Sequence, residues 1–142
     1  MVGLGWITAG LGSRSDIRVV TVEGDAARSS AAQQAGSWPT WVSFVVGDAI
    51  EVVPELGTFD LLFADAEGGK CYGLDETIAA VGPRGLLVLD DLQPQTWKTG
   101  DERTQTLHLA KMQEMRATVT RRPDLLSVEL DNGAGVLLAV RI

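Results

Sequence analysis

Four short apolar runs recur along the first two thirds of the chain. They are rich in β-branched and large aliphatic residues, which is typical of buried strands. The runs are Arg18–Val22, Trp41–Val46, Asp60–Ala64 and Gly85–Leu89. Because they contain few polar residues, they predict a parallel sheet covered on both faces.

Helical segments are predicted before, between and after these strands. A glycine-containing turn at the start leads into the first of them, and Asp25 and Gly36 are placed to begin and end the second. The predicted segments are Val2–Leu11, Asp25–Ala35, Ala49–Pro54, Leu74–Val81 and Arg103–Val119, the last with Leu107, Ala110, Met112, Met115 and Val119 at roughly helical spacing. Strands that alternate with helices indicate an α/β fold with a doubly wound sheet.

The end of the chain has a different pattern. Leu126–Leu130 and Gly135–Arg141 flank the turn Asp131-Asn132-Gly133, which predicts an antiparallel hairpin. A mostly parallel sheet finished by such a hairpin differs from the plain dinucleotide-binding arrangement, whose strands are all parallel. For a chain of 142 residues we predict one domain, residues 1–142.

Composition narrows the class of protein. The formal net charge of −7 argues against a general nucleic-acid binder, which needs a basic face. No apolar run approaches the roughly 18 residues of a membrane span, so we expect no membrane partner. The lone cysteine, Cys71, cannot form an internal disulfide, which fits a cytoplasmic protein.

Acidic residues follow all four predicted strands. They are Glu23, Asp48, Asp65 and the pair Asp90 and Asp91. Ligands of open α/β sheets bind outside the carboxyl ends of the strands. Four strands that end in this way indicate a shared site.

The first two acids suit a nucleoside-like ligand. Glu23 lies twenty residues after Gly3 of the Gly3-Leu4-Gly5 run, the distance at which an acid accepts hydrogen bonds from ribose hydroxyls. It could equally be an acid at a helix N-terminus. Asp48, in Gly47-Asp48-Ala49, could accept a bond from an adenine amino group or cap the short helix after it.

The last three acids suit a metal ion. Neighbouring strand ends would bring Asp65, Asp90 and Asp91 together, and clustered carboxylates repel one another unless a cation or proton is present. Oxygen ligands favour Mg²⁺. The alternative is that Asp91 caps a turn before Pro94 while Asp90 serves the loop.

Other polar and aromatic residues allow either a functional or a packing interpretation. Lys70, on a glycine-bearing loop after Asp65, could act as a general base or position a substrate, or it could simply be solvated. His108 falls within a predicted helix and is interpreted as a surface or packing residue. Trp97 could line a substrate pocket, whereas Trp6, Trp38 and Trp41 are interpreted as packing residues.

Four motifs together resemble a known family. VVTVEGDAAR, VVGDAIEVVPEL, FDLLFADAEGGKCY and GPRGLLVLDDLQPQTW occur in this order. They resemble the class I O-methyltransferases of the catechol and caffeoyl-CoA type, above all the small bacterial members, over nearly the whole chain. The resemblance implies a Rossmann-like methyltransferase fold, S-adenosyl-L-methionine as cofactor, and methyl transfer to a hydroxyl or phenol of a small molecule. A homodimer is compatible with it.

The resemblance also implies roles for single residues. Glu23 would hold the ribose, Asp48-Ala49 the adenine, and Lys70 would be the catalytic lysine, on a slightly longer loop. Asp65 and Asp90 would bind the metal, and Asp91 stands where the family often has a metal-binding asparagine. The cofactor-binding candidates are Gly3, Gly5, Glu23, Gly47, Asp48, Ala49 and Asp65. The candidate metal ligands are Asp65, Asp90 and Asp91. The candidate catalytic residues are Lys70 and Asp65.

The start of the chain departs from the family pattern. The run from Met1 to Trp6 resembles only the end of the family's glycine motif, and the apolar strand that precedes this motif is absent. We therefore expect a fragment or a misplaced start, with unpaired edges on the first and third strands. The gap could close by direct pairing, be filled by a partner chain, or remain a cleft. An in-frame strand and glycine motif upstream of Met1 would support this expectation.

Two other functions remain open at the level of sequence. A nicotinamide dehydrogenase domain would use Glu23 but not the terminal hairpin or the group Asp65, Asp90 and Asp91. A non-catalytic domain that keeps the fold and acts by association would fit the missing strand. Binding of NAD or of S-adenosylhomocysteine separates the three hypotheses.

Overall fold

The computed structural model describes residues 16–93, 101–131 and 133–142. The chain divides into two compact units between Val52 and Val53, and each unit is described by itself. The predictions for Val2–Leu11, with Gly3 and Gly5, and for Trp97 lie outside the described residues. The prediction of one domain stays a prediction.

The first unit contains a pair of parallel strands and a helix. Strand β1 (Val19–Glu23) pairs with β2 (Val42–Val46), and helix α2 (Ala26–Gln34) connects them. Asp25 caps α2 as predicted, because its carboxylate accepts hydrogen bonds from the backbone nitrogens of the next turn.

Aromatic packing holds the first unit together. The Trp38 indole nitrogen donates to the Ala32 carbonyl at 3.0 Å, and its ring meets the Phe44 ring edge-on with centroids 5.5 Å apart. This geometry is favourable for two aromatic rings. The interpretation of Trp38 as a packing residue is confirmed.

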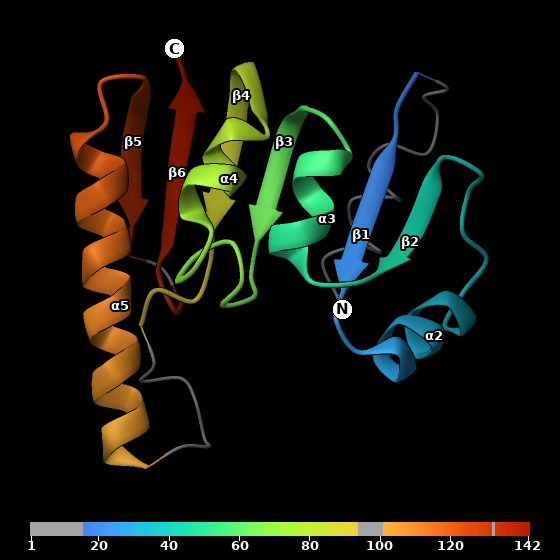
Figure 1. Ribbon diagram of the computed structural model, residues 1–142, viewed down its shortest axis with the longest axis horizontal. Coiled ribbons are helices and arrows are strands. Elements are labelled where there is room, and N and C mark those ends of the chain that lie inside the picture. The colour runs from blue at the N-terminus through green and yellow to red at the C-terminus, as the bar shows by residue number, and fades with distance from the viewer. Residues whose placement is uncertain (1–15, 94–100, 132) are drawn as a thin grey trace. The chain divides into compact units, whose positions relative to one another are not determined.

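The second unit is built around a mixed sheet (Figure 1). Its strands are β3 (Phe59–Ala64), β4 (Val81–Leu89), β5 (Leu125–Leu130) and β6 (Val136–Arg141), in the order β3-β4-β6-β5. Strands β3 and β4 are parallel, and β6 is antiparallel to both of its neighbours. The predicted hairpin is confirmed. The helices are α3 (Ala49–Glu55), which spans the boundary between the units, α4 (Leu74–Ala79) and α5 (Glu102–Arg121).

The prediction of a helix over Leu74–Val81 is wrong at its end. Helix α4 stops at Ala79, and Val81 already pairs with Phe59 of β3. Strand β4 therefore starts four residues before the predicted Gly85, with a register shift on its partner. Gly85 permits this close pairing, since a Cβ there would lie 2.9 Å from the Phe59 carbonyl oxygen.

The core lies between the sheet and its helices. Leu87, Leu89 and Leu137 are fully buried on the face that α4 and α5 cover, together with Ile78, Ala139, Met112, Met115 and Val119. On the opposite face, Leu126 is 69% exposed and Val128 is 55% exposed. This alternation is expected for strands whose side chains point to opposite faces.

The buried face of helix α5 contains Met112, Met115 and Val119 of the predicted spacing, but Leu107 and Ala110 lie outside it. His108, Met112, Met115 and Val119 are buried, whereas Leu107 is 57% exposed. The spacing of the buried residues follows one helical stripe. Within the described part of the chain, no helix combines the length and the apolar character needed to cross a membrane.

The described strands belong to two separate sheets. Strand β1 pairs with β2 in the first unit, and β3 pairs with β4 in the second. The predicted parallel pairing is found within each unit. The structure thus has an α/β fold whose parallel strand pairs are followed by an antiparallel hairpin.

Candidate active site

The carboxyl ends of β1 and β2 bring the first group of candidate residues together. Glu23 and Val46 are register partners, and the backbone nitrogen of Gly47 donates to the Glu23 carbonyl at 3.1 Å. Glu23 is a half-buried residue, and its carboxylate accepts a hydrogen bond from the Asp25 nitrogen at 3.0 Å. Glu23 and the Gly47-Asp48-Ala49 turn therefore lie side by side.

Asp48 begins helix α3. Its Oδ1 accepts a hydrogen bond from the Ile50 nitrogen at 3.0 Å, which is the bond of an N-cap residue. Gly47 is needed for this tight turn, because a Cβ there would lie 2.6 Å from the Val52 side chain. The capping alternative for Asp48 is thus realised, and its role toward an adenine stays a prediction.

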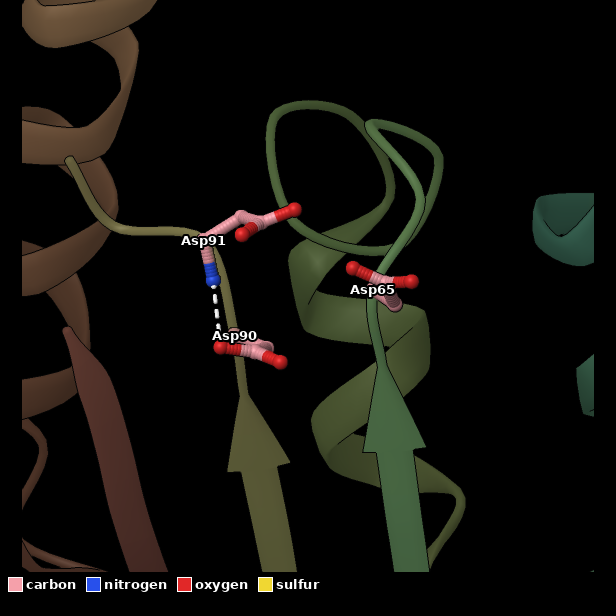
Figure 2. A group of neighbouring side chains, drawn as sticks. All are labelled: Asp65, Asp90 and Asp91. Atoms are coloured by element: carbon pink, nitrogen blue, oxygen red, sulfur yellow. Dashed lines mark hydrogen bonds between the residues drawn. The ribbon is translucent and has the colours of Figure 1, made fainter. Parts of the chain in front are cut away.

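The carboxyl ends of β3 and β4 bring three carboxylates together. The register pairs Ala64 with Leu89, so the following residues, Asp65 and Asp90, lie side by side. Oxygens of Asp65, Asp90 and Asp91 lie within 4.8 Å of one another. Figure 2 shows these side chains converging from the two strand ends, with the Asp91 nitrogen donating to Asp90 Oδ1 at 2.8 Å.

We call Asp65, Asp90 and Asp91 the carboxylate cluster. Simultaneous ionisation of all three carboxylates is unfavourable. Burial raises the pKa of the Asp91 carboxyl, and the nearby charges of Asp65 and Asp90 raise it further. A hydrogen bond with Asp65 also favours the protonated form of Asp91. Oxygen atoms in this arrangement form a donor set that suits a hard divalent cation.

Lys70 lies beside the cluster and is only 3% exposed, so the alternative of a solvated loop lysine is excluded. Its Nζ donates to the Asp90 carbonyl at 2.7 Å. Burial lowers the pKa of the Lys70 amine, while the charges of Asp65, Asp91 and Asp90 act in the opposite direction. A buried amine of this kind is easier to deprotonate than a solvated one.

A tight turn holds Lys70 in place. The Gly69 nitrogen donates to the Tyr72 carbonyl at 2.7 Å, and the Cys71 nitrogen donates to the Glu67 carbonyl at 2.8 Å. Gly69 has φ +92°, a region that favours glycine, and a Cβ there would lie 2.9 Å from Thr77 Oγ1. The backbone turn at Glu67-Gly68-Gly69-Lys70 therefore places the Lys70 side chain in the protein interior, where it contacts the Asp90 carbonyl.

We expect replacement of Gly69 by alanine (G69A) to destabilise the protein by about 1–3 kcal/mol, because the new side chain meets both a strained φ and a close neighbour. The matched control is Gly57→Ala, where φ is +86° but no atom lies within 4 Å of the added Cβ. The free energy of unfolding in urea should fall more for G69A than for G57A. Equal losses would show that the contact with Thr77 is unimportant.

The loop that carries Lys70 is tethered to α5. The Tyr72 hydroxyl donates to Glu67 Oε2 at 3.2 Å, and Lys111 of α5 donates to the same hydroxyl. The Lys111 ammonium also lies 4.3 Å from the centroid of the Tyr72 ring and 3.8 Å from Glu67 Oε2. These contacts fix the loop relative to the helix that packs on the sheet.

His108 is buried in α5, which confirms the packing alternative. The residue is only 3% exposed, so the surface alternative is wrong, and its Nε2 lies 3.2 Å from the Asp91 carbonyl oxygen. One signal in the sequence could have placed it correctly. His108 precedes Met112, Met115 and Val119 by four, seven and eleven positions, which is the spacing of one buried helical face.

Solved structures resemble this chain over almost its full length, whereas no protein-family model and no curated protein sequence matches it. A Staphylococcus aureus protein assigned as a caffeoyl-CoA O-methyltransferase superposes with a TM-score of 0.79 at 16% identity, covering 98% of this chain and 72% of its own. The O-methyltransferase of Bacillus cereus in complex with SAH gives 0.77 at 17% identity, covering 99% and 70%.

A third neighbour extends the likeness beyond bacteria. The SAH-bound methyltransferase of Podospora anserina has a TM-score of 0.76 at 17% identity, with 99% of this chain and 68% of the neighbour covered. The likeness to these proteins lies in the course of the backbone rather than in sequence identity. The chain therefore has the Rossmann-like methyltransferase fold.

Proposed function

We propose that this chain is an S-adenosyl-L-methionine-dependent O-methyltransferase that methylates a hydroxyl or phenol of a small molecule with the help of a divalent cation. The observation that carries the proposal is the carboxylate cluster with buried Lys70 beside it, at the carboxyl ends of adjacent parallel strands. The fold shared with solved O-methyltransferases supports the reaction class.

In this proposal, residues of the first unit bind the cofactor. The Glu23 carboxylate would accept hydrogen bonds from the ribose hydroxyls, since it stands at the carboxyl end of β1. The Gly47-Asp48-Ala49 turn, which lies against Glu23 through the Gly47 nitrogen, would contact the adenine. The remaining cofactor-binding candidates are Gly3, Gly5 and Asp65.

Residues of the second unit bind the cation and handle the proton. Asp65, Asp90 and Asp91 would hold the cation, because their oxygens converge and because burial and the neighbouring carboxylates raise the pKa of Asp91, although the charge of Lys70 acts in the opposite direction. When bound, the cofactor supplies an electrophilic methyl group and the cation stabilises a substrate oxyanion. Lys70 would take the hydroxyl proton of the substrate, and its burial favours the neutral amine that this step requires.

Calorimetric titration of the chain with S-adenosylhomocysteine, with and without Mg²⁺, tests the cofactor part of the proposal. We expect saturable binding to the wild type. Glu23→Gln should weaken it by about 10–100-fold, because hydrogen bonds to a charged group are worth about 1.5–3 kcal/mol. The control is Glu55→Gln, which removes the same charge from an exposed position at the end of α3 and should leave the affinity unchanged.

Two outcomes would contradict this function. Tight binding of NAD without binding of S-adenosylhomocysteine would identify a dehydrogenase domain. Absence of binding to either compound, in a chain whose circular dichroism shows that it is folded, would favour a non-catalytic domain that acts by association. Equal weakening by the Glu23 and Glu55 variants would assign the effect to net charge rather than to the ribose contact.

A further inference from the structure

The segment that follows β4 is held by a contact at each successive residue. The Asp90 carbonyl accepts from Lys70 Nζ at 2.7 Å, and the Asp91 carbonyl lies 3.2 Å from His108 Nε2. The Leu92 nitrogen donates to the Gly135 carbonyl at 3.3 Å, and the Gln93 nitrogen donates to the Ala134 carbonyl at 2.7 Å. These contacts to Lys70, His108 and the segment before β6 therefore fix the course of the backbone at Asp91.

Asp91 itself has an unfavourable backbone conformation. Its φ is +56°, in the left-handed region that residues other than glycine seldom adopt. Such a conformation persists only where the surroundings hold it. Its consequence here is that the Asp91 side chain points toward Asp65 (Figure 2) instead of continuing the direction of the strand.

His108 reaches this position from the buried stripe of α5. A carbonyl oxygen can only accept a hydrogen bond, so the contact with Asp91 requires that His108 carry a proton on Nε2. The imidazole is 3% exposed and lies one helical turn before the fully buried Met112. Its position is thus fixed by the packing of the helix.

We propose that His108 is a positioning residue of the cation site, because its Nε2–H holds the Asp91 carbonyl and thereby keeps the Asp91 carboxylate directed at Asp65. This inference rests on the proposed function, since it assumes that the carboxylate cluster binds a divalent cation. His108 does not itself contact the cation; it acts on a ligand through that ligand's backbone. Removal of such supporting hydrogen bonds weakens metal sites by about 10–100-fold.

Titration with Mn²⁺, followed by calorimetry and by electron paramagnetic resonance, tests the inference on the full chain. His108→Gln keeps an N–H near the position of Nε2, whereas the shorter His108→Asn is polar but does not reach the Asp91 carbonyl. We expect His108→Asn to weaken Mn²⁺ binding by about 10–100-fold, and His108→Gln to stay within about threefold of the wild type. The resonance spectrum of bound Mn²⁺ should change for His108→Asn and be restored for His108→Gln.

The possible failures are distinguishable. If the wild type itself binds no Mn²⁺, the cation site fails, and the role of His108 falls with it. If the wild type binds Mn²⁺ and His108→Asn binds equally well, the positioning role alone is overturned. Equal losses in both variants would also overturn it, since the restored N–H would then have no effect. Circular dichroism of each variant shows that the comparison is made between folded proteins.

Discussion

Replacement of Lys70 by methionine (K70M) should lower the rate of methyl transfer from S-adenosylmethionine to a small phenol such as catechol by about 10²–10⁴-fold, the usual contribution of a general base. Methionine approximates the length of the lysine side chain and suits a position that is 3% exposed. The measurement is kcat, followed by the release of S-adenosylhomocysteine. The affinity for S-adenosylhomocysteine should not change, because Lys70 is not among the cofactor-binding candidates.

Lys70→Arg separates a proton-transfer role from a purely electrostatic one. Arginine keeps the positive charge near the Asp90 carbonyl but cannot give up its proton at ordinary pH. A general base predicts that Lys70→Arg is as slow as K70M, whereas a positioning charge predicts that much of the rate returns. An unchanged kcat in K70M would eliminate Lys70 from the reaction.

Replacement of Leu137 by alanine (L137A) should lower the free energy of unfolding by about 2–5 kcal/mol, the cost of removing a buried leucine side chain and leaving a cavity. Leu137 of β6 is fully buried between the sheet and α5. Urea denaturation measures the change. Leu126→Ala is the matched control, because Leu126 of the neighbouring strand is 69% exposed. This change should lower the free energy of unfolding by less than about 1 kcal/mol.

A comparable loss in the two leucine variants would show that the covered face of the sheet is not the core of this unit. The two variants can be compared directly because both leucines lie in the same hairpin and both substitutions remove the same atoms. The two positions differ in the face of the sheet and in the strand, since Leu137 lies in β6 and Leu126 in β5 at the end of the strand order.

Much of the fold was predictable because local pattern and tertiary structure agree. The apolar runs around Val20, Phe44 and Leu62 are strands in the structure, and the turn after Leu130 joins an antiparallel hairpin. The approach of Asp65 to Asp90 also followed from the sequence, since adjacent parallel strands end at the same edge. These features depend on spacing along the chain, which the sequence contains directly.

Other features depend on contacts between distant residues. Val81 continues a helical pattern, but pairing with Phe59 draws it into a strand. The burial of Lys70 depends on a turn at Gly69 and on a carbonyl twenty positions along the chain, and no local pattern encodes either contact. The sequence left His108 open between the surface and the packed face, and its burial follows from the packing of α5, in which Leu107 is 57% exposed.

The left-handed backbone at Asp91 limits which amino acids can occupy that position. Asparagine and aspartate tolerate positive φ better than other side-chain-bearing residues, and both offer an oxygen ligand. Exchange between the two types therefore alters the charge of the carboxylate cluster by one unit while the chain keeps its course. Replacement of Asp91 by asparagine would thus alter the charge of the proposed cation site without rebuilding the loop.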